Sequence, residues 1–276
     1  MSFDVVRAAT LPAEALCDAF NAAFANYVVT LPTLDVDAWR ATTARQGCDL
    51  SLSLAACRGA QVMAFSLITP RDGGITRIAT MGARPEARGS GIAGALLDQS
   101  LDEARARGNG FAELEVFAQN ERAFRLYRSR GFQPVCTLAG FEANGLAGHD
   151  APVDDVSRED GIAWAQAFER DERGALPWQV SAGAIAAAPA AQRIWRHGGA
   201  QMSWLESADT ITVMSVLDRD AAYANAARLL GALAHRFPKH KLRAPQLQRE
   251  VGPADAFERA GWTRSPLFQY LMRCSL

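Results

Sequence analysis

A glycine-rich segment, RGSGIAG at residues 88–94, carries the first residues whose types and spacing could do chemistry. Gly89, Gly91 and Gly94 have the spacing G-x-G-x-x-G. Glycines at the start of a helix leave the backbone N–H groups uncovered, so these groups can bind an anion such as a pyrophosphate. The spacing does not by itself distinguish a dinucleotide from another pyrophosphate ligand.

The residues around this loop argue against a dinucleotide. Glu113 does lie near the position at which such a site carries its ribose-binding acid. A nucleotide-binding β-α-β unit, however, places its glycine turn directly after a buried strand. Here ARPEAR at 83–88 separates the glycines from preceding strands that have the pattern of antiparallel hairpins. The sequence therefore disfavours a dinucleotide.

Two segments together carry a family resemblance. RPEARGSGIAGALL at 84–97 has the pattern R/Q-x-x-G-x-G/A at Arg88, Gly91 and Ala93, and NERAFRLYRSRGF at 120–132 has the pattern N-x-x-A-x-x-L-Y-x-x-x-G-F. Both resemble the motifs of the GNAT superfamily of acetyl-CoA-dependent N-acetyltransferases, over about residues 1–143. The resemblance implies that acetyl-CoA is the co-substrate and that a primary amine attacks it directly in a ternary complex. It leaves open whether the amine belongs to a small molecule or to a peptide N-terminus.

The resemblance also implies which residues bind the coenzyme. Backbone N–H groups of the glycine loop would face the pyrophosphate, and Arg88 would contribute chiefly its backbone. The strand before the loop would splay from the next one, with Gly82 permitting a bulge. Asn120 would orient the coenzyme or cap the short helix that follows it. The implied coenzyme-binding residues are Met81, Ala83, Arg88, Gly89, Ser90, Gly91, Ile92, Ala93 and Asn120.

Acetyl transfer needs a proton for the departing thiolate and a neutral amine. Tyr127 matches the general-acid tyrosine of the family. Glu115 is similar in its spacing from Tyr127 to the catalytic base of ribosomal-protein alanine N-acetyltransferases. Glu113 shares the strand face of Glu115 by period two, and the two carboxylates are expected to repel each other. The base can be Glu115, Glu113 or a water molecule, because the strand ITRIATMG carries no acid.

The resemblance implies an α/β fold with a mixed, mostly antiparallel sheet of the acyl-CoA N-acyltransferase type, in tandem domains. Strands with period two, followed by an amphipathic helix over about 90–107, predict a catalytic domain over residues 1–143. A linker is predicted over 144–155, where Gly, Ala, Asn, Asp and Pro accumulate. Residues 156–276 partly repeat the order of elements and are predicted to form a second domain.

The predicted second domain lacks the chemistry of the first. Aligning Gly131 and Phe132 with Gly261 and Trp262 places Phe257 at the position of Tyr127. The three loop glycines correspond in the same way to Ala222, Ala224 and Ala227. Phenylalanine has no proton to donate, and alanines do not form the same cradle. The second domain is therefore interpreted as a degenerate GNAT-like domain without the pyrophosphate loop.

Composition excludes several other classes of function. A formal net charge of -1 gives no bulk attraction for nucleic acid or for an anionic membrane. The sequence has neither a leader pattern nor a long apolar run, which predicts a cytoplasmic protein. Its 5 cysteines and 4 histidines are scattered, so no metal is predicted. A non-catalytic acyl-CoA sensor or interaction protein is the alternative function, and the oligomeric state is not indicated.

Overall fold

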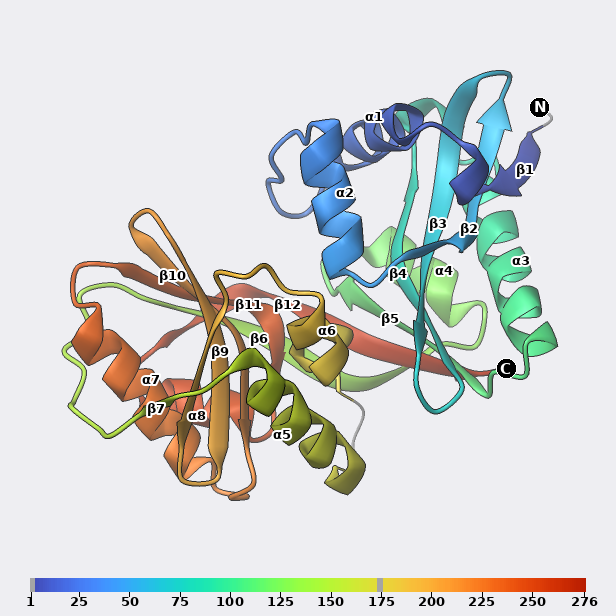
Figure 1. The fold of residues 1–276 in the computed structure, drawn as a ribbon. Coiled ribbons are helices and arrows are strands. Elements are labelled where there is room, and N and C mark those ends of the chain that lie inside the picture. The colour runs from blue at the N-terminus through green and yellow to red at the C-terminus, as the bar shows by residue number, and fades with distance from the viewer. Residues whose placement is uncertain (1–2, 173–175) are drawn as a thin grey trace. The chain divides into compact units, whose positions relative to one another are not determined.

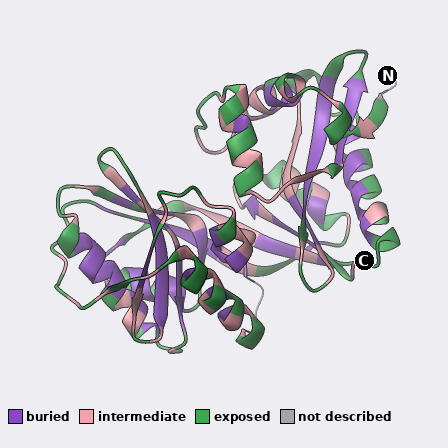
Figure 2. Cartoon of the chain, in the orientation of Figure 1, coloured by how far each residue is buried: buried purple, intermediate pink, exposed green. Residues whose placement is uncertain are grey.

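The computed structural model describes residues 3–172 and 176–276 (Figure 1). The chain divides into two compact units. Unit 1 comprises Met1–Pro134 together with Met272–Leu276, and unit 2 comprises Val135–Leu271. The predicted α/β class with a mostly antiparallel sheet is confirmed, and the strands carry most of the buried residues (Figure 2).

Unit 1 is a sheet covered by helices on both faces. Alternate residues of β2 explain the two layers, because Ala55 and Cys57 pack against α1 and α2 whereas Leu54 and Ala56 pack against α3. Short α4 follows β5. The elements are β1 (Asp4–Arg7), α1 (Ala13–Phe24), α2 (Val36–Arg45), β2 (Asp49–Arg58), β3 (Gln61–Arg71), β4 (Ile75–Ala83), α3 (Ile92–Ala106), β5 (Phe111–Phe117) and α4 (Glu121–Arg128), with 3₁₀ turns at Ala8–Thr10 and Pro85–Ala87.

Strands β4 and β5 are parallel and part after three residue pairs, Ile75–Arg77 against Phe111–Glu113. The pairing of β4 with β3 shifts register at Ala79. The bulge predicted at Gly82 therefore lies three residues earlier in the strand. Gly82 has a packing role instead, since a Cβ there would lie 2.8 Å from the Phe65 ring and 2.9 Å from Ala23.

Unit 2 has the same kind of layered sheet. Helices α7 and α8 pack on one face, and α5 and α6 contribute to the smaller apolar clusters. Its strands run in the order β12-β6-β11-β10-β9-β8-β7. The elements are β6 (Gln133–Ala143), β7 (Asp154–Asp155), α5 (Arg158–Asp171), a 3₁₀ turn (Trp178–Val180), α6 (Ala182–Ala186), β8 (Arg193–His197), β9 (Ala200–Ser207), β10 (Thr210–Asp218), α7 (Ala224–Arg236), β11 (Lys241–Arg249), α8 (Pro253–Arg259) and β12 (Thr263–Ser275).

The division between the units differs from the predicted boundary at residue 143. Strand β6 belongs to unit 2 from Val135 onward and pairs with β11. The last residues of the chain return to unit 1, where the Leu276 N–H donates to Gly110 O at 3.0 Å and Arg273 forms an ion pair with Glu113. Unit 2 thus contains most of β6, and unit 1 contains the last residues of β12. The predicted linker is not an open tether, because Gly148 packs tightly against α7.

Candidate active site

A cavity of about 750 Å³ in unit 1 opens where β4 and β5 part. It is bounded by the end of α1, the end of β4, the glycine loop with the start of α3, and α4. The lining includes most of the predicted site residues: Met81, Ala83, Arg88, Gly89, Gly91, Ile92, Ala93, Asn120 and Tyr127. Ser90 and Glu115 are not among the lining residues. The motifs of the loop and of α4, separate in sequence, therefore meet in one cavity.

The glycine loop presents uncovered backbone to this cavity. Gly89 and Gly91 have φ angles of +82° and +85°, a region that L-residues rarely adopt, and Gly91 is the N-cap of α3. No atom lies within 4 Å of a Cβ built on either residue. The Ser90 hydroxyl donates to Ala87 O at 2.7 Å and so closes the loop on itself. The Ile92 N–H donates to Ser90 Oγ at 3.4 Å. The other N–H groups at the start of α3 and the helix dipole can face an anion.

Arg88 holds the loop in place through its side chain. Its Nη2 donates to Ala23 O at 2.9 Å and its Nε donates to Ala83 O at 3.4 Å. The guanidinium group thus connects the loop to the end of α1 and to the end of β4. A cationic group remains at the cavity wall even though its donors bind backbone carbonyl groups.

Asn120 connects α4 to the aromatic wall. Its Oδ1 accepts the Ala123 N–H at 3.2 Å, so the residue is the N-cap of α4. Its side chain also forms a hydrogen bond with Tyr27. The Tyr27 ring packs edge-on against Phe24 and Phe117. Asn120 therefore has a structural role that is independent of any coenzyme.

Tyr127 is the group in this cavity best suited to donate a proton. The residue is 8% exposed, and its ring packs edge-on against Phe132 with centroids 5.9 Å apart. Burial, with a smaller contribution from Tyr27, raises the pKa of the Tyr127 phenol above its ordinary value. The phenol is therefore neutral and protonated throughout the physiological pH range.

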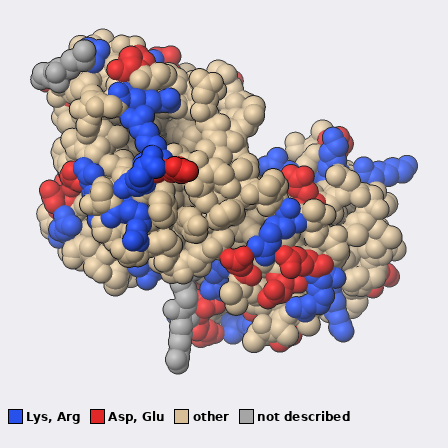
Figure 3. All heavy atoms as spheres, turned by 180° about the vertical axis from the view of Figure 1, so that it is seen from behind, with Lys and Arg blue, Asp and Glu red and all other residues tan. Residues whose placement is uncertain are grey.

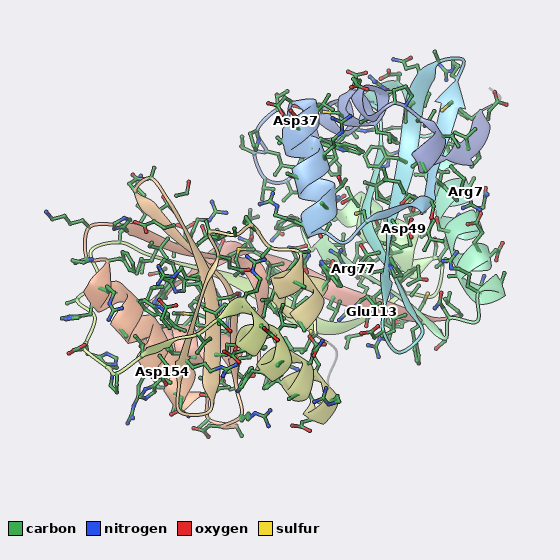
Figure 4. The ribbon with its side chains drawn as sticks, in the orientation of Figure 1. Arg7, Asp37, Asp49, Arg77, Glu113 and Asp154 are labelled. Atoms are coloured by element: carbon green, nitrogen blue, oxygen red, sulfur yellow. The ribbon has the colours of Figure 1, made fainter. Side chains whose placement is uncertain are left out.

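The two candidate bases both form buried ion pairs with arginine. Glu115 accepts from Arg77 Nη2 at 2.7 Å and from Arg77 Nε at 3.0 Å, and the side chains are 5% and 1% exposed. Glu113 accepts from Arg71 at 2.8 Å and from Arg273. These cations compensate the repulsion expected between the two carboxylates. Figure 4 labels Arg77 and Glu113 on the adjacent strands β4 and β5, beside the point where those strands part.

The sequence motifs did not predict the arginine partners of the two carboxylates. Arg77 lies inside the apolar strand ITRIATMG, and a charged residue in such a strand is a signal of a buried ion pair. Among residues 3–172 and 176–276, no group of three or more His, Cys, Asp or Glu side chains is placed to hold a metal. No helix in those stretches is long and apolar enough to cross a membrane.

Comparison with known proteins gives a family for this region. Residues 14–132 match the model of the acetyltransferase (GNAT) family. A mycothiol acetyltransferase of Beutenbergia cavernae is 40% identical over 83 residues, which are 30% of this chain and 28% of that relative. The matched segment thus spans less than a third of the relative. Both matches are to acetyltransferases.

Solved structures resemble the chain over nearly its whole length. A Pyrococcus horikoshii protein superposes with a TM-score of 0.72 at 12% identity and covers 99% of this chain and 89% of its own. A GCN5-related N-acetyltransferase of Sphaerobacter thermophilus superposes with a TM-score of 0.64 at 14% identity, over 99% of this chain and 95% of that one. At these identities the likeness establishes the fold alone.

Proposed function

Residues 14–132 of this chain belong to the GNAT acetyltransferase family, and on that premise we propose that the protein transfers the acetyl group of acetyl-CoA to a primary amine. The observation that carries the proposal is one cavity with an open glycine cradle at one side and the protonated Tyr127 phenol at another. The first feature suits a pyrophosphate, and the second suits a departing thiolate. The five free cysteines support a reducing compartment such as the cytoplasm.

In the proposed reaction the chain binds both substrates together. N–H groups of the loop and of the start of α3 hold the pyrophosphate, and the backbone of Met81 and Ala83 lies along the thioester. The amine attacks the acetyl carbon, so that a C–N bond forms as the C–S bond breaks. Tyr127 donates its phenolic proton to the thiolate sulfur. The proposed chemistry uses no metal.

Removal of the amine's proton has three candidate routes, through Glu115, through Glu113 or through a water molecule, and both carboxylates form ion pairs with arginine. Glu115 can accept it only after its hydrogen bonds with Arg77 rearrange, whereas a water molecule in the cleft requires no such change. Glu115→Gln alone leaves Arg77 as an unbalanced buried charge, so the test needs the double variant Arg77→Met/Glu115→Gln as well. If Glu115 is the base, both variants should lose rate chiefly at low pH, where the amine is protonated. Equal pH–rate profiles in the double variant and the unmodified chain would exclude Glu115 and leave Glu113 or water as the base.

The acceptor is to be found by screening amines for thiol release from acetyl-CoA. The screen should include small amines, peptide N-termini and the acceptor of mycothiol acetyltransferase, since one relative carries that name. Phe24, Tyr27 and Val28 line the cavity and favour an acceptor with an apolar part. Thiol release above the rate of acetyl-CoA hydrolysis would support the proposal.

A second function is a sensor that binds acyl-CoA without turnover. One observation favours it, namely that both candidate bases already form buried ion pairs. Coenzyme binding in the absence of turnover with any amine of the screen would assign this function. The oligomeric state can be measured in the same preparations.

A further inference from the structure

The cavity of unit 1 carries a second arginine that the proposed coenzyme site does not use. Arg122 lines the cavity from the first turn of α4. Leu126 is four residues later on the same face of the helix, and its Cδ1 lies 3.7 Å from a Cβ built on Gly94 of α3. Arg122 is therefore on the side of α4 that faces the start of α3. The residue is exposed, so it stands at the rim of the cavity.

Arg122 differs from the other arginines of this region in its partners. Three neighbouring arginines each have a side-chain acceptor: Arg125 with Glu121 at 3.0 Å, Arg130 with Asp98 at 3.0 Å, and Arg128 with Gln133. Over the part of the chain that the structure describes, the Arg122 side chain has neither an ion pair nor a hydrogen bond. Its five N–H donors are therefore open to a ligand.

The charges around the cavity favour an anion at Arg122. The charged lining residues are Arg88, Glu121 and Arg122, and Glu121 already pairs with Arg125. The Arg88 donors bind backbone carbonyl groups. The two carboxylates of β5 pair with arginines and are not among the lining residues, and neither is the exposed Glu86. The guanidinium of Arg122 thus has no nearby carboxylate to compensate it, and a ligand anion would do so.

The chemistry of coenzyme A offers one anion for this position. The coenzyme has two anionic groups, a pyrophosphate and a phosphate monoester at the 3′ position of its ribose. The proposed function assigns the pyrophosphate to the N–H groups of the glycine loop. With the thioester beside the buried Tyr127, the adenosine end and its 3′-phosphate are expected at the rim. A phosphate monoester is largely dianionic at neutral pH, and a guanidinium can donate two parallel hydrogen bonds to it.

We propose that Arg122 binds the 3′-phosphate of coenzyme A and makes the site selective for the coenzyme over its 3′-dephospho form. The inference rests on the proposed function, because it requires the coenzyme to lie in this cavity. Arg122 acts in binding alone, at the end of the coenzyme that is remote from the thioester. The interaction is electrostatic and exposed, so the selectivity should decrease as salt is raised.

The probes are coenzyme A and 3′-dephospho-coenzyme A, titrated calorimetrically into the full chain at one low ionic strength. The unmodified chain should bind coenzyme A about tenfold more tightly than the dephospho form, the size expected for charge-assisted hydrogen bonds with a phosphate. Equal affinities for the two probes would overturn the inference and leave the proposed coenzyme site standing. Failure of both probes to bind would overturn the proposed function and the inference together.

Variants locate the contact. Arg122→Gln should bind the two probes within about twofold of each other, because it removes the cation from an exposed position without disturbing a partner. Arg128→Gln is the matched control, since it removes the same charge from the same helix at a residue outside the cavity lining. It should keep the preference of about tenfold. A preference that survives in Arg122→Gln would assign the 3′-phosphate to another group. An equal loss of affinity for both probes would assign Arg122 to the pyrophosphate, and either result would overturn the inference.

Discussion

Units 1 and 2 contain the same parting pair of parallel strands. In unit 1 the pairing stops after Ile75–Arg77 and Phe111–Glu113, and in unit 2 it stops after Thr210–Thr212 and Lys241–Arg243. A cavity opens beyond each pairing. The arrangement that gives unit 1 its candidate active site is therefore present twice, and the difference in chemistry has to come from the residues around it.

The short helices after the parting strands also agree in geometry. Phe132 packs edge-on against Tyr127 at 5.9 Å, and Trp262 packs edge-on against Phe257 at 5.0 Å. Gly131, with φ of +86°, precedes Phe132, and Gly261, with φ of +83°, precedes Trp262. This agreement supports the predicted register between the two halves of the sequence. In this register Phe257 of unit 2 takes the position of Tyr127 and lacks its hydroxyl group.

The units differ most at the start of the helix that connects the two parting strands, which is α3 in unit 1 and α7 in unit 2. At α3 the N–H groups face an open cavity, whereas at α7 the Asp218 carboxylate accepts the Ala226 N–H at 2.9 Å and the Asp220 N–H at 3.0 Å. Unit 2 therefore supplies its own anion at the position where unit 1 is proposed to bind phosphate. Tyr223, with φ of +53°, is the N-cap of α7 and packs its ring against Gly252.

The segment of unit 2 that was predicted to be a linker, residues 144–155, adds a second obstruction. Gly148 and His149 pack against Gly231 of α7, and Leu146 lies near Gly261 after α8. This segment therefore occupies part of the space beside α7 and α8, where it lines a cavity of about 510 Å³.

Surface charge does not distinguish unit 1 as a separate anion-binding surface. In Figure 3 a strip of Lys and Arg crosses unit 1, but acidic residues lie beside it.

The largest expected effect is the loss of coenzyme binding in Gly91→Asp. The carboxylate would stand where phosphate is proposed to bind, so affinity should fall below detection while the chain stays folded. Ala224→Asp is the matched change in unit 2 and should leave coenzyme affinity unchanged. Calorimetric titration measures both. Retained affinity in Gly91→Asp would mean that the cradle lies elsewhere, and a loss in Ala224→Asp would give unit 2 a coenzyme site.

A smaller effect is expected when Tyr127 is converted to the residue found in unit 2. Tyr127→Phe removes one hydroxyl and keeps the ring, so turnover should fall about 10²-fold while coenzyme affinity changes little. Steady-state rates with an accepted amine provide the measurement. The converse variant Phe257→Tyr should leave turnover as it is. Full activity in Tyr127→Phe would refute its role as the general acid.

Asp218→Ala should destabilise unit 2 by about 1–2 kcal/mol, because it removes an acceptor from the start of α7. It should not create a coenzyme site, since Tyr223 and the segment at Gly148 remain in place. Asp35→Ala removes the exposed cap of α2, a 2.8 Å bond to the Ala38 N–H, and should cost less. Urea unfolding compares the two variants. New coenzyme binding in Asp218→Ala would show that a single carboxylate separates the units.

Local motifs explain which parts of this comparison the sequence predicts. The loop glycines, Tyr127 and the Phe257 substitution lie in short segments whose spacing is enough to place them. The place of β6 in unit 2 and of the last residues of β12 in unit 1 was not predictable, because strands with the same alternating pattern do not specify their partners. The ion pair of Glu113 with Arg273 joins residues 160 positions apart, and no local pattern records it. The sequence shows that Asp218 ends an apolar strand, but its hydrogen bond with the Ala226 N–H of α7 depends on the fold.

The smallest expected difference is in how stability depends on pH. Burial raises the pKa of the Tyr127 phenol in the folded chain, whereas a tyrosine in an unfolded chain ionises near pH 10. The stability that comes from the neutral phenol is therefore complete below about pH 10 and is lost as the pH rises toward the raised pKa. Between about pH 10 and 11 the free energy of unfolding of the unmodified chain should fall more steeply than that of Tyr127→Phe, by up to about 1.4 kcal/mol per pH unit. Urea unfolding at a series of pH values gives both slopes. Parallel slopes would mean that the phenol ionises equally in the folded and unfolded states, and that burial at this position does not distinguish Tyr127 from an ordinary tyrosine.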